Sequence, residues 1–252
     1  MKKYVFLALL AFGTFALTAC DKSKDKNNPD DPASEEVSKN GIKNEFGEGR
    51  LFIGGWYPSD YAVGQHKMIN YYFYSDGESE TTAFKSYNRQ KGYWSYNPEN
   101  KVLSSTMGLI GAWQINMLNA YAIQAVSVSN QNSYSLSREE DSYGKVRYVD
   151  NNPKLIIGRW QTKDKSATFE FTLDKYKYVK GDLVKSGSYK INYVKTEERY
   201  LYVENGDVVI SFDGNKRYNL YNLSGGYLWI DPLEGSNQPK DYIGEFYYVS
   251  GN

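Results

Sequence analysis

The chain has few of the side chains that catalysis commonly uses. Among its 252 residues there is one His, His66, and one Cys, Cys20. A single His excludes a multi-histidine metal site and leaves little acid–base chemistry near neutral pH. A single Cys excludes an internal disulfide, a thiolate zinc cluster and a C-x-x-C redox pair. We therefore expect no catalytic residues, no metal and no cofactor, and we interpret His66 as a solvated loop residue.

Tyrosine is the abundant residue with binding chemistry, at 25 of 252 residues. Aromatic rings contribute large apolar surfaces, and the hydroxyl of Tyr can orient a polar group of a ligand. Seven rings are the candidates for lining an apolar ligand site: Tyr71, Phe73, Trp94, Tyr96, Trp113, Phe171 and Tyr189. The alternative is that these rings only form a core, since their removal from water stabilises a fold without any ligand.

The overall charge argues against nucleic acid as a partner. Thirty basic residues balance thirty acidic ones. A general nucleic-acid binder needs a basic face, and the sequence shows no excess of positive charge to build one.

The N-terminal segment has the organisation of a signal peptide. Lys2 and Lys3 precede an apolar run from Tyr4 to Leu17, which is too short to span a bilayer comfortably. The run ends in Leu17-Thr18-Ala19-Cys20, which resembles the lipobox of bacterial lipoproteins. The resemblance implies cleavage after residue 19 and lipidation of Cys20, and hence a membrane partner through a lipid anchor in the outer membrane. The alternative is an ordinary secretory signal with an incidental Cys.

Residues 20–44 are expected to be the lipidated Cys and a flexible tether. The stretch 21–40 is rich in charge and has almost no aliphatic side chains, so it cannot bury enough surface to fold. Cleavage after residue 19 leaves 28 basic and 30 acidic residues, a net charge of −2. Whether the protein faces the cell surface or the periplasm stays open.

Beyond residue 44 the pattern predicts an all-β, antiparallel fold that occurs as two tandem copies. Short runs of Tyr, Val, Ile, Phe, Trp and Thr alternate with turn pairs such as Asp76-Gly77 and Asp213-Gly214. Four segments recur in the same order: 51–56 as 155–160, 69–73 as 167–171, 92–96 as 187–191 and 113–118 as 218–223. We predict domains at 45–140 and 154–252, joined by the polar stretch 139–153.

Alternation along the strands assigns side chains to faces. Phe169, Phe171 and Leu173 are predicted to point inward, and the equivalent inner face of the first copy contains Tyr71, Phe73 and Trp113. About eight strands per copy suit a closed up-and-down barrel or a strongly curled meander. By the same alternation, five tyrosines are predicted to point outward, to the face opposite the core: Tyr72, Tyr74, Tyr200, Tyr202 and Tyr221. They suit contact with a glycan or a protein, although cross-strand pairing with strand propensity, or packing between the two domains, would also explain them.

Each copy begins with a Gly-x-Trp motif, Gly54-Gly55-Trp56 and Gly158-Arg159-Trp160, and ends with a strand at 133–138 or 245–249. This order resembles the lipocalin-like (calycin) domains of bacterial lipoproteins. The resemblance implies that Trp56 and Trp160 close the bottoms of their barrels. It also implies that Arg138 stacks on Trp56, whereas the last strand of the second copy has no basic residue for Trp160. Lipocalins carry small hydrophobic molecules, but these copies are shorter.

The expected function is non-catalytic binding in the cell envelope. The first hypothesis is a small hydrophobic or amphipathic ligand inside a barrel. The alternative is a surface module that binds glycan or protein through exposed tyrosines.

Overall fold

The computed structural model describes residues 46–58, 69–83, 86–108, 110–138, 147–194 and 203–249, with backbone only at 83 and 86–88. The chain divides into two units, residues 1–39 and 40–252, and every described residue belongs to the second. Cys20, the predicted signal peptide and tether, and His66 lie outside the described residues. None of the helices in the described ranges is long and apolar enough to cross a membrane.

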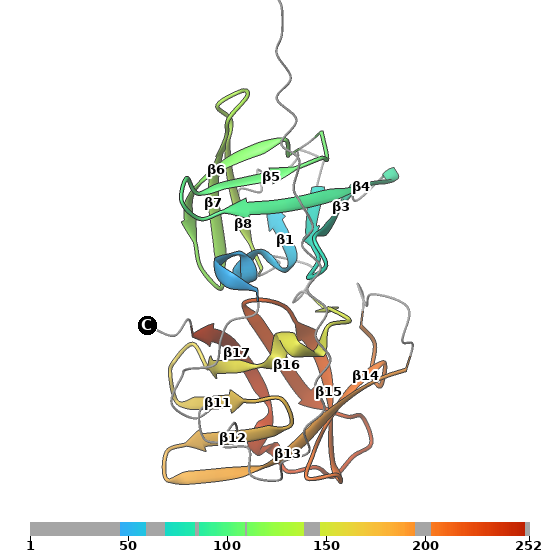
Figure 1. The fold of residues 1–252 in the computed structure, drawn as a ribbon. Helices are drawn as coiled ribbons and strands as arrows, with labels where there is room; N and C mark the ends of the chain where they lie inside the picture. Colours follow the sequence, from blue (N-terminus) through green and yellow to red (C-terminus); the bar gives the residue numbers. More distant parts are fainter. Residues whose placement is uncertain are drawn as a thin grey trace, which may run out of the picture. The chain divides into compact units, whose positions relative to one another are not determined.

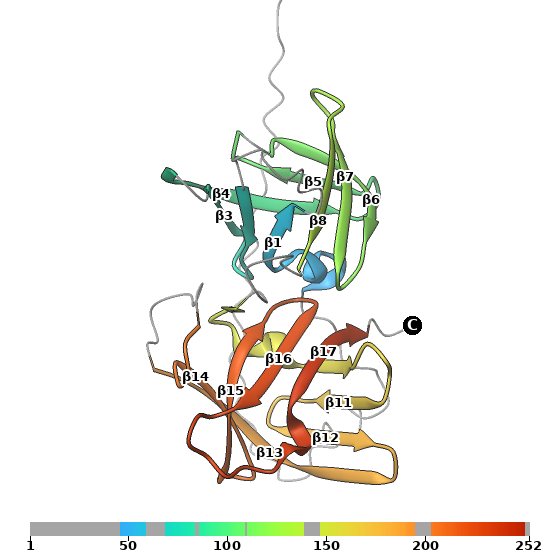
Figure 2. The same ribbon diagram turned by 180° about the vertical axis from the view of Figure 1, so that it is seen from behind.

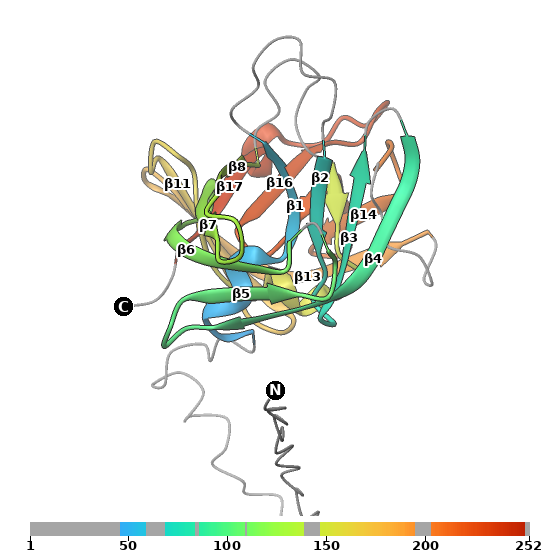
Figure 3. The same ribbon diagram turned by 90° about the horizontal axis from the view of Figure 1, so that it is seen from above.

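Eight consecutive strands form a closed first barrel (Figure 1). Each strand pairs antiparallel with the next, and the ring closes where Tyr57 and Pro58 pair with Ser137 and Leu136. Figure 3 shows β1, β2, β3 and β4 side by side around this barrel. After the short 3-10 helix η1 (Gly47–Phe52), the strands are β1 (Gly54–Pro58), β2 (Ile69–Phe73), β3 (Glu78–Ala83), β4 (Ser86–Asn97), β5 (Val102–Ser105), β6 (Ala112–Leu118), β7 (Ala122–Ser127) and β8 (Ser133–Ser137).

A second barrel repeats this order and adds one strand (Figure 2). The barrel closes through β10–β17 and β14–β15 pairing, and β9 joins β15 in parallel at Tyr148 and Val149. The elements are β9 (Tyr148–Val149), η2 (Pro153–Ile156), β10 (Gly158–Gln161), β11 (Ala167–Phe171), β12 (Lys175–Lys180), β13 (Leu183–Tyr193), β14 (Val208–Phe212), β15 (Lys216–Leu223), β16 (Tyr227–Pro232), η3 (Lys240–Tyr242) and β17 (Gly244–Val249).

The prediction of an all-β fold with two tandem barrels is confirmed. The two copies of the internal repeat have the same strand topology. The four recurring segments lie in β1 and β10, β2 and β11, β4 and β13, and β6 and β15. Each pair therefore occupies the same position in the strand order of its barrel. The predicted turn at Asp213-Gly214 lies in the three-residue connection from β14 to β15, and both residues have positive φ values, 52° and 77°.

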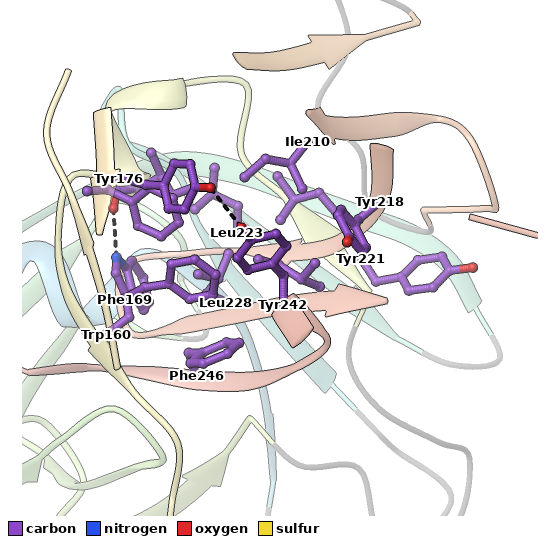
Figure 4. Packing of buried hydrophobic residues seen from close by; sticks show 14 of the residues in the cluster. Trp160, Phe169, Tyr176, Ile210, Tyr218, Tyr221, Leu223, Leu228, Tyr242 and Phe246 are labelled. Carbon is purple, nitrogen blue, oxygen red and sulfur yellow. Dashed lines mark hydrogen bonds between the residues drawn. The ribbon is translucent and has the colours of Figure 1, made fainter. Parts of the chain in front are cut away.

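Aromatic rings fill the second barrel (Figure 4). The ring of Phe169 lies 4.9 Å from that of Phe171, 4.6 Å from Tyr178 and 5.0 Å from Phe246, measured between centroids. Tyr242 of η3 closes over the same group, with its centroid 4.6 Å from that of Phe212. Such contacts between rings add to the stability gained by burial.

Three features of the fold differ from the sequence-based expectation. Leu173 is 74% exposed, because β11 ends at Phe171 and Leu173 lies in the turn to β12. The predicted polar linker contains β9, whose Tyr148 and Val149 are fully buried. Tyr72 and Tyr74, predicted to be on a wet face, are buried against Tyr148.

Candidate functional site

Trp56 and Arg138 pack against each other where η1 leads into the first barrel. The guanidinium of Arg138 lies 3.9 Å from the centroid of the Trp56 ring, and the indole N–H of Trp56 donates to the Phe52 carbonyl at 2.7 Å. Both side chains are buried. Arg138 also donates to the Ile53 carbonyl at 3.1 Å, so the cation is held between a ring and the backbone.

The glycine of each Gly-x-Trp motif makes room for the group that covers the tryptophan. Gly54 and Gly158 have φ values of 127° and 134°, a region that favours glycine. A Cβ atom at Gly54 would collide with Arg138, and a Cβ at Gly158 would lie 2.6 Å from Cε2 of Tyr248. The glycine of the motif therefore has two roles: it adopts a positive φ, and its lack of a side chain lets Arg138 or Tyr248 lie close to the backbone.

Trp160 receives its cation from outside its own barrel. Arg50, in η1 before the first barrel, lies 4.0 Å from the Tyr248 ring centroid and 5.5 Å from that of Trp160. Its Nε donates to the Gly225 carbonyl at 3.0 Å, and Nη2 donates to the Leu155 carbonyl. Analysis of the last strand alone could not find this residue, because Arg50 precedes Trp160 by more than one hundred positions.

Both closing arginines are buried and bonded to neutral groups. Burial lowers the pKa of Arg50 to about 10 and that of Arg138 to about 9. Neither forms an ion pair with a carboxylate among the described residues, and Nε of Arg138 has no hydrogen-bond partner there. The junction of the two barrels therefore contains two cations that no carboxylate among the described residues pairs with.

The predicted inward rings of the first barrel form two contact groups. Phe73, Trp94 and Tyr96 lie beside Phe52 of η1, with centroids 6.2, 6.0 and 4.8 Å from its ring. Tyr71 pairs with Trp56 in the β1–β2 ladder, two positions along from the pair of Gly54 and Phe73.

The second group consists of Tyr71, Trp113 and Tyr134. The Trp113 ring stacks on Tyr134 at 4.6 Å between centroids, and Tyr71 meets it edge-on at 5.2 Å. The indole N–H of Trp113 is buried without a hydrogen-bond partner among the described residues. Burial, and secondarily the proximity of Tyr134, raise the pKa of Tyr71 to about 12. Buried polar groups normally have hydrogen-bond partners, so the Trp113 indole N–H, among the described residues, lacks an acceptor that such a group usually has.

The second barrel presents a contrast, because most of its inward hydroxyls have partners. Tyr189 donates to the Thr172 carbonyl at 2.8 Å, and its ring meets Phe171 at 5.0 Å. The hydroxyls of Tyr176 and Tyr242 lie 2.8 Å apart, and Tyr176 donates to Asp213. Phe171 and Tyr189 thus belong to a packed and largely satisfied core.

The three outward tyrosines that the structure describes are buried and do not form an exposed stripe. Tyr72 and Tyr74 stack on Tyr148, with centroids 6.2 and 6.3 Å away. Tyr221 is 7% exposed and lies beneath Arg147, whose guanidinium is 4.5 Å from the ring centroid. Tyr148 of β9, in the stretch between the two predicted domains, covers Tyr72 and Tyr74, while Tyr200 and Tyr202 lie outside the described residues.

The described residues contain no group of three or more His, Cys, Asp and Glu side chains that could hold a metal ion. The chain is an all-β protein with two closed eight-stranded antiparallel barrels in tandem, which is consistent with a calycin-like fold. Comparison with protein-family models, curated proteins and solved structures found no match.

Proposed function

We propose that this chain is a lipid-anchored, non-catalytic binding protein of the bacterial cell envelope, and that it binds a small hydrophobic or amphipathic molecule. The lipobox-like sequence ending at Cys20 and the charged segment after it support the anchor and an outer-membrane location. The ligand site is the end of the first barrel that contains Tyr71, Trp113 and Tyr134.

The observation that carries this proposal is the buried indole N–H of Trp113, which has no acceptor in the part of the chain that the structure describes. Leaving a buried donor unsatisfied costs about 1–3 kcal/mol, and a carbonyl, carboxylate or ether oxygen of a ligand would remove that cost. The surrounding rings would cover the apolar part of the same molecule, which is the chemistry of an amphipathic ligand.

The surface-module hypothesis receives less support. It relied on five outward tyrosines, and three of these, Tyr72, Tyr74 and Tyr221, are buried by other parts of the protein. Buried rings offer no platform to a glycan or a protein partner.

Native mass spectrometry of a chain that begins at residue 40 tests the proposal. This chain retains every described strand of both barrels. It should co-purify from cells with a bound small molecule, or gain thermal stability with a panel of fatty acids and lysophospholipids.

The double variant Tyr71→Phe/Trp113→Phe should lose this binding, because it removes both polar groups and keeps aromatic rings. Tyr189→Phe is the matched control in the second barrel. The proposal would be refuted if the wild-type chain purified without a ligand and its thermal stability did not change with any lipid of the panel. Undiminished binding by the double variant would also refute it.

A further inference from the structure

The connection between β16 and β17 of the second barrel is longer than its counterpart in the first. Residues 128–132 join β7 to β8, whereas residues 233–243, which include η3, join β16 to β17. The first barrel closes with the shorter connection. A closed barrel of this topology therefore does not need the added segment 233–243.

The added segment has one fully buried side chain, and that side chain enters the barrel. Tyr242 has no exposed surface, whereas the other residues of the segment are half-buried or exposed. Figure 4 shows its ring among the rings of the core. The centroid of the Tyr242 ring lies 5.3 Å from that of Tyr178 and 5.7 Å from that of Tyr176, and both rings meet it edge-on.

Tyr242 occupies the place in the second barrel that corresponds to the proposed ligand site of the first. In the segments that recur, Phe169 is the counterpart of Tyr71, and Tyr218 is the counterpart of Trp113. The Tyr242 ring lies 5.9 Å from the Phe169 ring and 5.7 Å from the Tyr218 ring, between centroids. The second barrel thus fills this place with a side chain of its own.

The groups around Tyr242 match the chemistry of a phenol beside a carboxylate. The hydroxyls of Tyr242 and Tyr176 lie 2.8 Å apart. The ammonium groups of Lys185 and Lys216 lie 5.2 and 5.9 Å from the Tyr242 ring centroid, within the range of a cation–π contact. Asp241, the preceding residue, forms an ion pair with Lys185. The added segment therefore presents a carboxylate and a hydroxyphenyl ring to the barrel.

The two lysines differ in what the added segment does for them. Lys216 donates to Asp213 of the β14–β15 turn at 2.9 Å, and Asp213 also accepts from the Tyr176 hydroxyl. That pairing does not involve the segment 233–243. Lys185 pairs with Asp241, so departure of the segment would leave its ammonium group without that carboxylate, beside the vacated ring position.

The attachment of the segment permits it to move as a piece. Gly235 and Gly244 lie near its two ends with φ values of 75° and 154°, and glycine has more conformational freedom than any other residue. The segment lies outside the β16–β17 ladder and contacts the barrel through the Asp241 ion pair, the Tyr242 ring and a bond from the Tyr218 hydroxyl to the Pro239 carbonyl. Segments with few such contacts open more readily than strands do.

We propose that the second barrel binds a small aromatic acid, a phenol that carries a carboxylate, and that the segment 233–243 is an internal plug of this site. The ring of the ligand replaces that of Tyr242, its hydroxyl bonds to Tyr176, and its carboxylate pairs with Lys185 in place of Asp241. The plug lowers the apparent affinity, because only the open fraction of the molecules can bind. This site is independent of the ligand proposed for the first barrel.

Isothermal titration of the chain from residue 40 with 4-hydroxyphenylacetate tests the proposal. The wild type should bind this probe. The methyl ester of the probe lacks the carboxylate and phenylacetate lacks the hydroxyl, so both should bind more weakly. Hexanoate, which has a carboxylate without a ring, should not bind.

Hydrogen exchange shows whether the plug leaves. With saturating 4-hydroxyphenylacetate, the amides of residues 236–243 should exchange faster in the wild type, because the segment loses its contacts with the barrel, and the amides of β16 and β17 should not. This measurement needs no substitution in the core, so it decides the question even if a variant of Tyr242 fails to fold.

Variants then locate the site. Tyr242→Ala removes the internal occupant and should raise the affinity about tenfold or more, and Asp241→Asn should raise it to a lesser degree. In the Tyr242→Ala background, Lys185→Gln should lower the affinity about tenfold, because it removes a charge-assisted hydrogen bond. Lys190→Gln removes the same charge from the exposed face of β13 and should leave the affinity unchanged.

The proposal fails if the wild type does not bind 4-hydroxyphenylacetate at millimolar concentration, if the methyl ester binds equally well, or if bound probe leaves the exchange of residues 236–243 unchanged. Binding by Tyr242→Ala alone would show that the substitution had created a cavity and that Tyr242 is only a core residue. The variant Tyr71→Phe/Trp113→Phe should bind this probe as the wild type does. Loss of the probe in that variant would place it in the first barrel and overturn the assignment.

Discussion

The guanidinium of Arg50 lies 4.0 Å from the ring centroid of Tyr248, and this contact joins the segment before the first barrel to the last strand of the second. The same side chain bonds to the carbonyl oxygens of Gly225 and Leu155. One residue thus covers Trp160 and satisfies two backbone acceptors.

Replacing Arg50 should destabilise the second barrel in particular. Arg50→Met keeps an apolar stem but removes the cation–π contact and leaves two carbonyl groups without their donor, at a cost of roughly 2–4 kcal/mol. Urea unfolding followed by fluorescence should show the loss. The control Arg159→Met, whose exposed side chain only approaches Glu170 at 3.9 Å, should cost less than about 1 kcal/mol. Equal effects of the two variants would contradict the assigned role of Arg50.

The motif glycines should tolerate no side chain. Gly54→Ala and Gly158→Ala would each force a positive φ on alanine and drive its Cβ into Arg138 or Tyr248, which should cost about 2–4 kcal/mol. Gly108→Ala is the control, because its Cβ would meet no atom within 4 Å. Thermal unfolding of the three variants measures the difference. A melting temperature for Gly54→Ala as high as that for Gly108→Ala would show that the close approach is unimportant.

The folded protein should lose stability in alkaline solution. Burial raises the pKa of Tyr71, Tyr178 and Tyr218 from 10 to about 12. Between about pH 10 and pH 12 the unfolded chain therefore loses phenolic protons that the folded chain retains, so the free energy of unfolding falls as pH rises.

The two buried arginines act in the opposite direction. Their lowered pKa values allow the folded chain to release protons before the unfolded chain does, which favours folding as pH rises above about 9. Because the shifted tyrosines outnumber them, the net trend above pH 10 should be downward. Urea unfolding at pH 8, 9, 10 and 11 measures it, and a constant or rising stability from pH 10 to 11 would contradict this balance.

Lipidation should depend on Cys20 alone. Cells that express the full chain and receive a labelled fatty acid should transfer the label to the wild type, whereas Cys20→Ser should carry none. The control Ser23→Ala changes a residue of the predicted tether and should retain the label. Label on the Cys20→Ser chain would refute the lipobox interpretation.

Alternation of side chains predicted the barrel cores well, because each strand has one inner face. It identified Tyr71, Phe73 and Trp113 correctly as inward residues of the first barrel. It failed at Leu173, where a turn begins one residue after the last strand residue, Phe171, so parity no longer applies.

The outer faces were harder to predict because parity does not reveal what covers a sheet. Tyr72 and Tyr74 have the parity of solvent-facing residues, yet Tyr148 of β9 packs on them. β9 has only two residues and its pairing with β15 is distant in sequence, so no local pattern indicates it. The resemblance to lipocalin-like domains suggested Arg138 as the cation for Trp56. The cation beside Trp160 is Arg50 of η1, before the first barrel, and no sequence pattern near Trp160 indicates it.

The position of Arg50 also bears on the history of the duplication. A gene for the first barrel alone would encode both Trp56 and its cation, Arg138. A gene for the second barrel alone would encode Trp160 and Tyr248 without the guanidinium of Arg50 that packs beside them. The two copies are therefore not interchangeable modules, because the second depends on a side chain that precedes the first.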